Sequence, residues 1–168
     1  MADENDIAGR KSQLIGQING LICNCSKVDP MTRNRLIQVC CTSFYGCQIW
    51  DLCNTKWIKD FCIAWRKYVR RLWSLPANTT SDAVYLVADV IPIFDELCKR
   101  VLSFVSSCCH SDSALVRFVL KHRIDARVNS PLGRNVTFCS LRYGVSVHDL
   151  CSLQFPSSFY THLYFAIT

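Results

Sequence analysis

The chain has 168 residues, half of them apolar, and carries 19 Lys and Arg against 13 Asp and Glu, which gives a formal charge of +6. This apolar content excludes wholesale disorder, and the length suits a single domain. The longest uncharged stretches, 36–50 and 152–168, are broken by polar residues or proline. They therefore do not provide the uninterrupted apolar run of about 18 residues that a membrane span needs.

The first 75 residues predict three helices. Apolar side chains recur at helical spacing over residues 6–25 and again over residues 29–44. Gly46 predicts an interruption of the helix or a close packing contact. Residues 55–75 contain neither glycine nor proline and are followed by Pro76, so a third helix is expected there.

Three further helices are predicted before residue 125. Ser81 can cap a short helix, and Pro92 fits the first turn of the next one. Ser111 or Ser113 then begins a helix that ends near residue 124.

The C-terminal part differs from the rest of the chain. Residues 129–135 are rich in turn residues and predict a loop, whereas residues 136–147 alternate loosely and predict one or two short strands. The sequence thus predicts a mainly α fold, a small bundle of five or six helices with an irregular, short-stranded C-terminal tail. The predicted segments are a helical segment (1–54), a basic helix with the helical region after it (55–127) and the tail (128–168).

Most of the excess charge lies in residues 55–75, which carry six basic side chains and one acidic side chain. At 100° per residue, Trp57, Phe61, Trp65 and Leu72 share one side of the expected helix, within about 80° of one another, and the cations occupy the rest of the circumference. We expect the aromatic side to pack on the domain and the basic side to meet phosphates. Tyr68 belongs to the same aromatic stripe.

Two clusters of cations are therefore candidates for nucleic-acid binding, one on the basic helix and a smaller one near residue 120. The candidate residues are Lys59, Arg66, Lys67, Arg70, Arg71, Arg117, Lys121 and Arg123. Three alternatives stay open for the basic helix: a face that is only solvated, a helix that lies on a membrane surface, and a helix bound in a calmodulin-like groove.

The 12 cysteines are expected to be reduced. The chain starts Met-Ala-Asp-Glu-Asn-Asp, which is acidic and polar, whereas a secretory signal begins with a basic and then an apolar region. We therefore expect an intracellular protein, nuclear or cytoplasmic and not secreted. Its thiols then behave as small buried hydrophobic groups, as predicted for Cys40, Cys62 and Cys98.

Motifs for a metal site or a catalytic centre are missing. No Cys-x-x-Cys pair occurs, and the closest groupings, such as Cys23 with Cys25, lack the spacing that lets two sulfurs reach one zinc ion. The sequence also lacks a Gly-x-Ser-x-Gly string and a glycine-rich phosphate loop. We therefore expect no cofactor and no enzymatic activity of this chain on its own.

Two strings resemble the region after the polymerase palm in reverse transcriptases of LINE-type (non-LTR) retrotransposons. The first is Ser43-Phe-Tyr-Gly-Cys-Gln-Ile-Trp-Asp-Leu52, and the second, more specific one is Phe61-Cys-Ile-Ala-Trp-Arg-Lys-Tyr-Val-Arg-Arg-Leu-Trp-Ser-Leu-Pro76. Ile91-Pro-Ile, Arg100 with Phe104, and Ser130-x-x-Gly-Arg-Asn135 continue the likeness in the same order, and residues 6–21 resemble the entry into the thumb. The resemblance covers about residues 4–145.

The chain also departs from this family. Thr79-Thr80-Ser81 stands where the family has Thr-His-Ser, and the palm motifs, including Tyr-x-Asp-Asp, are absent. The resemblance implies a non-catalytic C-terminal piece of an RNA-directed DNA polymerase, in which residues 1–54 belong to the thumb. It implies template–primer RNA or DNA as the partner, with Arg66 and Arg70 at the arginine positions of the family.

Two other classes of function remain as alternatives. One is a small helical interaction protein that binds an acidic protein or a membrane surface. The other is an enzyme in its own right. A thumb without its palm would also expose apolar surface, which favours association.

Overall fold

The structure is a computed structural model that describes residues 2–41, 44–53, 55–125, 130–144, 146 and 149. Within these residues it contains seven α-helices, one short 3₁₀-helix and no β-strand, which confirms the mainly α class. No helix in this part of the chain is long and apolar enough to cross a membrane. The elements are α1 (Ala2–Asn24), α2 (Pro30–Cys40), η1 (Cys47–Ile49), α3 (Thr55–Leu72), α4 (Ser81–Ala88), α5 (Ile93–Cys109), α6 (Ala114–Asp125) and α7 (Pro131–Tyr143).

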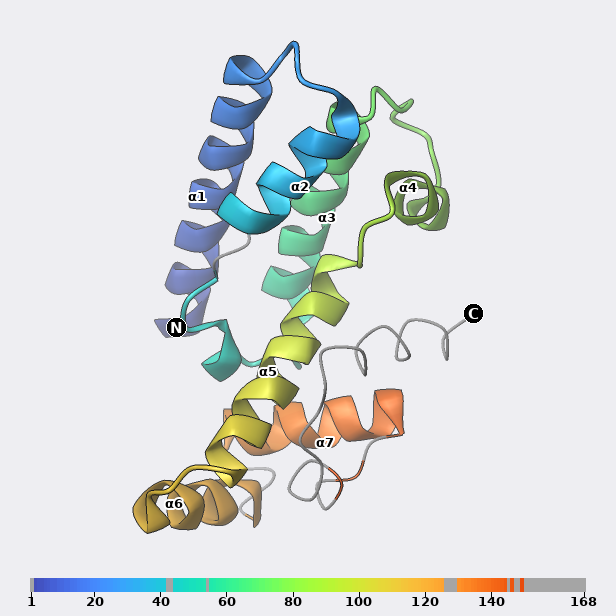
Figure 1. The fold of residues 1–168 in the computed structure, drawn as a ribbon. Helices are drawn as coiled ribbons and strands as arrows, with labels where there is room; N and C mark the ends of the chain where they lie inside the picture. The colour runs from blue at the N-terminus through green and yellow to red at the C-terminus, as the bar shows by residue number, and fades with distance from the viewer. Residues whose placement is uncertain are drawn as a thin grey trace. The chain divides into compact units, whose positions relative to one another are not determined.

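The chain forms two compact units (Figure 1). Unit 1 comprises Met1–Tyr45 and Thr55–Phe94, and unit 2 comprises Gly46–Asn54 and Asp95–Thr168. Each unit combines stretches from more than one of the predicted segments, and the division into 1–54, 55–127 and 128–168 stays a prediction.

Unit 1 is built around α3, which packs against α1, α2 and α4. The aromatic side of α3 provides much of the core, because Phe61, Trp65 and Leu72 are all at most 3 % exposed. The ring of Phe44 meets Phe61 edge-on, with centroids 5.2 Å apart. The predicted packing of the aromatic stripe is thus confirmed for these three residues, and Trp57 and Tyr68 are partly buried.

Capping side chains determine where two helices of unit 1 begin. The Asp29 carboxylate accepts a hydrogen bond from Thr32 N at 2.9 Å at the start of α2, and hydrogen bonds from Thr32 lower the pKa of Asp29. At the start of α4 the hydroxyl of Thr80 accepts from Ala83 N. The prediction that Ser81 is the cap is therefore wrong by one residue, because Ser81 is already helical.

Unit 2 contains η1, most of α5, α6 and α7. Gly46 adopts a φ of +85°, a left-handed conformation that glycine tolerates without steric cost, and η1 follows directly. The core of unit 2 combines residues from three elements, all at most 3 % exposed: Cys47, Trp50, Leu97, Cys98, Val101, Leu102, Val105, Val136 and Cys139.

Helix α7 corrects the prediction for the C-terminal part. Residues 130–135 were expected in a loop and the following residues in strands, yet Pro131–Tyr143 form one helix. The turn residues are start signals, because the Ser130 hydroxyl accepts from Gly133 N and Pro131 occupies the first turn. Gly144, with a φ of +66°, ends the helix. This seventh helix also exceeds the predicted five or six, and residues 150–168 of the predicted tail lie outside the described residues.

Candidate nucleic-acid interface

The cations of α3 lie on the side of the helix that faces away from the unit 1 core. Lys59 and Lys67 are exposed and Arg66 is partly exposed. On a regular helix Lys59, Arg66 and Arg70 fall within about 40° of one another, and Lys67 lies about 80° from Lys59. We call Lys59, Arg66 and Lys67 the α3 basic face.

The charges of the α3 basic face are not paired with acidic side chains in the described part of the chain. None of its three side chains forms an ion pair or a side-chain hydrogen bond there. The one acid of the helix is Asp60. Lys56, which was not among the predicted contact residues, adds a further exposed cation about 20° from Lys67, and its ammonium lies 5.3 Å from the ring centroid of Trp57.

Arg70 and Arg71 have intramolecular partners instead. Arg70 donates from Nε and Nη2 to the Thr79 carbonyl oxygen, at 3.2 and 2.7 Å, and so fixes the turn after α3. Arg71 donates from Nη1 to Asn19 Oδ1 on α1 at 2.9 Å. Both were predicted as nucleic-acid contacts, and the structure gives each of them a role within the fold of unit 1.

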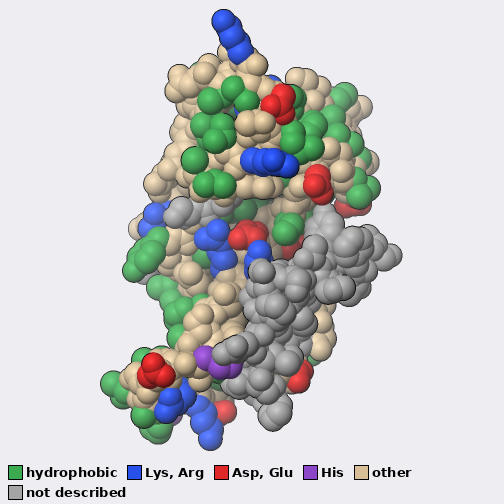
Figure 2. All heavy atoms as spheres, viewed as in Figure 1, with side chains coloured by type: hydrophobic (Ala, Val, Ile, Leu, Met, Phe, Trp, Pro, Cys, Tyr) green, Lys and Arg blue, Asp and Glu red, His purple; other side chains and the backbone are tan. Residues whose placement is uncertain are grey.

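The second predicted cluster is on α6 in unit 2. Arg117, Lys121 and Arg123 are all exposed, and Figure 2 shows Lys and Arg side chains beside hydrophobic ones over this helix. On a regular helix Arg117 and Lys121 lie about 40° apart, whereas Arg123 lies about 120° from Arg117. Arg117 also donates to the carbonyl oxygen of Ser111, just before the helix. Helix α6 therefore does not gather the three cations on one side.

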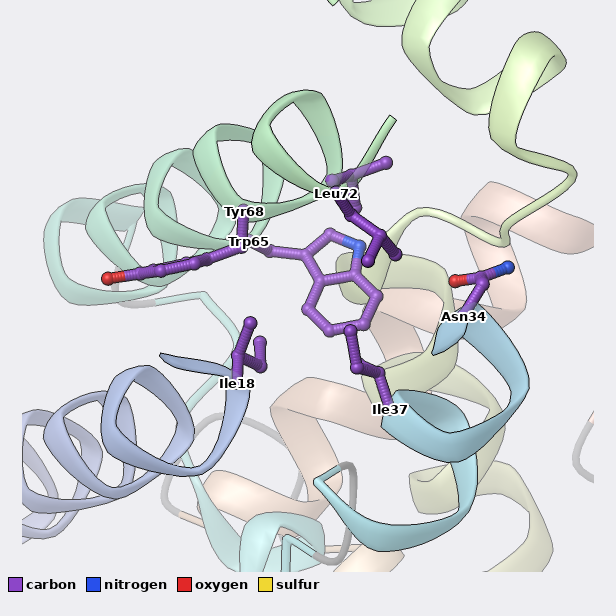
Figure 3. A pocket seen from close by; sticks show the side chains of 7 residues that line it. Ile18, Asn34, Ile37, Trp65, Tyr68 and Leu72 are labelled. Carbon is purple, nitrogen blue, oxygen red and sulfur yellow. The ribbon is translucent and has the colours of Figure 1, made fainter. Parts of the chain in front are cut away.

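Trp65 lines a small cavity beside α3 and is itself buried. The cavity is lined by Ile18, Asn34, Ile37, Trp65, Tyr68, Val69 and Leu72 (Figure 3). Its volume is about 10 Å³, close to the space that a single water molecule needs. Trp65 is 3 % exposed, so its ring is a core group and cannot stack on a nucleic-acid base.

Two strings of the resemblance are joined in unit 2, where Arg134 and Asn135 contact residues 50–52. Arg134 Nη2 lies 2.7 Å from Asp51 Oδ2. The buried side chain of Asn135 accepts from Leu52 N at 2.9 Å and donates to the Trp50 carbonyl oxygen. The residues that these strings share with the family thus join α7 to the chain around η1.

The thiols of the described residues form neither a disulfide nor a metal cluster. All eleven described cysteines are unbridged, and no group of three or more His, Cys, Asp or Glu in this part of the chain could hold a metal ion. Burial raises the pKa of Cys47 to about 11, and a hydrogen bond with Cys98 together with burial raises the pKa of Cys139. The same hydrogen bond with Cys139 lowers the pKa of Cys98, but Cys98 is fully buried, whereas a nucleophilic cysteine needs a lowered pKa and an accessible thiol together.

The predicted burial of individual thiols is confirmed in one case and wrong in another. Cys98 is fully buried, whereas Cys40 is exposed and Cys62 is partly buried. The buried residues of α2 are Asn34 and Ile37, and Cys41 directly after the helix is also buried, which leaves Cys40 on the outer side.

No family model, no curated protein and no solved structure matches the chain. The resemblance to LINE-type reverse transcriptases therefore rests on the strings given above.

Proposed function

We propose that the chain is a non-catalytic piece of a LINE-type reverse transcriptase that binds RNA or DNA through the α3 basic face inside the cell. One observation carries the binding proposal. Phe61, Trp65 and Leu72 of α3 are buried in the core, while Lys59, Arg66 and Lys67 stand at the surface without an acidic partner in the described part of the chain.

Such a face suits a polyanion that is recognised through its backbone. Cations that neutralise phosphates release condensed counterions, so they provide affinity without reading the base sequence. Trp65 is buried, so its ring is not available on this surface for stacking on a base. The surface therefore favours contacts with the phosphate backbone.

In the proposed family relationship, residues of the resembling strings have structural roles in the fold. Trp65 is a core residue, Arg70 fixes the turn that follows Pro76, and Asn135 joins α7 to the chain at Trp50. Each of these residues belongs to a resembling string and has a specific contact, which is what a shared fold would require of it.

The binding test compares two variants of equal charge. Lys59→Gln/Arg66→Gln/Lys67→Gln removes the α3 basic face, and the control Lys11→Gln/Lys27→Gln/Arg35→Gln removes three cations elsewhere in unit 1. Fluorescence anisotropy with labelled single-stranded RNA and with duplex DNA gives the affinity at a series of salt concentrations.

We expect the slope of log K against log salt to become shallower by about 2–3 in the α3 variant, because each lost phosphate contact removes about 0.7–0.9. The control variant should keep most of the wild-type slope. Equal slopes in the two variants, or a wild-type chain that shows no salt-sensitive binding at low ionic strength, would overturn the proposal.

The alternative partner is an acidic protein that meets the same cations. A pull-down from cell extract with and without nuclease treatment separates the two, because a direct protein partner survives the nuclease. Retention of the bound material after nuclease treatment would favour the interaction-protein alternative.

A further inference from the structure

Helix α6 presents a strip of large apolar side chains to solvent. Leu115 and Phe118 are each 70 % exposed and Val119 is 47 % exposed, whereas Leu120 is 6 % exposed. On a regular helix Leu115, Phe118 and Val119 lie within about 100° of one another, and Leu120 points about 150° away from the middle of that strip. Helix α6 packs against α7, and among the described residues the strip lies on the side away from the buried Leu120.

Cations border this strip along both of its edges. Lys121, with Arg117 behind it, lies on one edge, and Arg123 lies on the other, about 160° from Lys121 around the helix. Asp125, the last residue of α6, lies about 40° from Lys121 on the same edge, and Asp112 precedes the helix, so three cations face one acid within α6. Arg123 is separated from the other two cations, which argues against a single phosphate-binding cluster. The same separation places positive charge on both sides of the apolar strip.

We propose that α6 docks on an anionic lipid surface and lies parallel to it. Leu115, Phe118 and Val119 would enter the boundary between headgroups and acyl chains, while Lys121 and Arg123 extend their stems sideways and place their charges among the lipid phosphates. This partner is independent of the proposed nucleic-acid binding, which uses α3.

The charge pattern selects a lipid surface over a groove on another protein. A planar anionic surface can satisfy cations on both edges of the strip at once, and each adds electrostatic attraction near the surface.

Helix α4 offers a matched contrast in unit 1. Leu86 is 74 % exposed and Val87 is 53 % exposed, so this helix exposes a comparable apolar pair. Its charged neighbours are the acids Asp82 and Asp89 instead of cations. A pair of this kind should be repelled by an anionic membrane, which makes it the control.

The experiment measures co-sedimentation of the full chain with vesicles of phosphatidylcholine alone and of phosphatidylcholine mixed with phosphatidylserine. We expect binding to the mixed vesicles and little to phosphatidylcholine. Leu115→Ser/Phe118→Ser should weaken binding about tenfold or more, because each side chain loses its transfer into the lipid. Leu86→Ser/Val87→Ser should bind like the wild type.

Charge variants separate this proposal from the function proposed above. Arg117→Gln/Lys121→Gln/Arg123→Gln should reduce vesicle binding, and Lys59→Gln/Arg66→Gln/Lys67→Gln should leave most of it intact. Conversely, Leu115→Ser/Phe118→Ser should keep the wild-type affinity for RNA and DNA. Far-UV circular dichroism verifies that each variant keeps its helix content, which is expected because the substituted side chains are exposed.

Three outcomes would overturn the lipid proposal. Equal binding to the two kinds of vesicle would remove the role of anionic lipid, and wild-type binding by Leu115→Ser/Phe118→Ser would remove the role of the strip. A concentration-dependent dimer in sedimentation equilibrium that this variant no longer forms, without vesicle binding, would assign the strip to a second copy of the chain.

Discussion

Replacing Asn135 by alanine should destabilise unit 2 by an amount that can be worked out from two hydrogen bonds. The Asn135 side chain is fully buried, accepts from Leu52 N at 2.9 Å and donates to the Trp50 carbonyl oxygen. Trp50 and Leu52 are themselves 1 % and 2 % exposed, so their backbone groups have little access to water. Asn135→Ala therefore removes the acceptor of the buried Leu52 amide and a donor to the buried Trp50 carbonyl oxygen.

Each buried backbone group that loses this partner costs about 1–3 kcal/mol, so for the two groups we expect the free energy of unfolding to fall by about 2–6 kcal/mol. This loss is a large part of the roughly 5–15 kcal/mol that a domain has available. Urea unfolding followed by far-UV circular dichroism measures it, and hydrogen exchange at the Leu52 amide locates it. That amide should lose protection because its acceptor is gone.

Two further variants test the reasoning about Asn135. Asn135→Asp keeps the acceptor for Leu52 N but brings a buried charge beside the Trp50 carbonyl oxygen, so at neutral pH it should cost at least as much as alanine. Acidification should recover part of that loss, since a protonated carboxyl can donate again. Asn19→Ala, which removes an exposed hydrogen bond to Arg71, should cost about 0.5 kcal/mol or less. A loss below about 0.5 kcal/mol for Asn135→Ala would refute the argument from buried hydrogen bonds.

Three other perturbations test the core, a cap and a thiol. Trp65→Ala should lower the free energy of unfolding by about 3–5 kcal/mol in urea, because the ring is 3 % exposed, and a loss of about 1 kcal/mol would mean that the ring is not in the core. Thr80→Ala should cost about 0.5–2 kcal/mol and speed hydrogen exchange at the Ala83 amide, whereas Ser81→Ala should cost little. Because burial raises the pKa of Cys47 to about 11, the unfolded thiol ionises first and stability should decline between about pH 9 and pH 11. Cys47→Ala should flatten that part of the pH dependence of urea unfolding, and an unchanged profile would contradict it.

Local sequence signals predicted six of the helices and misread the seventh. The pattern of α3 is strong, since its apolar and basic residues separate around the helix without an interrupting glycine or proline. In α7 the residues Ser130, Pro131 and Gly133 predict a loop by composition, although the first two are also the ordinary signals for a helix start. Asn135 looks like one more turn residue, and its hydrogen bonds reach 83 and 85 positions back along the chain. No local pattern contains that information.

The charges of the candidate interface could be located from the sequence, but their partners could not. Arg66 and Arg70 lie about 40° apart on the same helix, so helical periodicity predicts that both face the nucleic acid. In the structure Arg70 donates twice to the Thr79 carbonyl oxygen, while Arg66 has no partner among the described residues. A helical wheel shows the direction of a side chain, whereas the group it meets depends on where the rest of the chain returns.

The comparison of α3 with α6 shows why amphipathic sequence alone does not identify a partner. Both helices combine large apolar residues with cations, but α3 is covered on its apolar side by α1, α2 and α4, whereas Leu115 and Phe118 of α6 are exposed. What remains outside on α3 is charge, so binding there should weaken steeply with salt. On α6 apolar surface remains together with charge, so part of its binding energy should persist at high salt, where charges are screened. The salt dependence of binding at each helix therefore shows whether its apolar side is buried in the fold or is available to the partner.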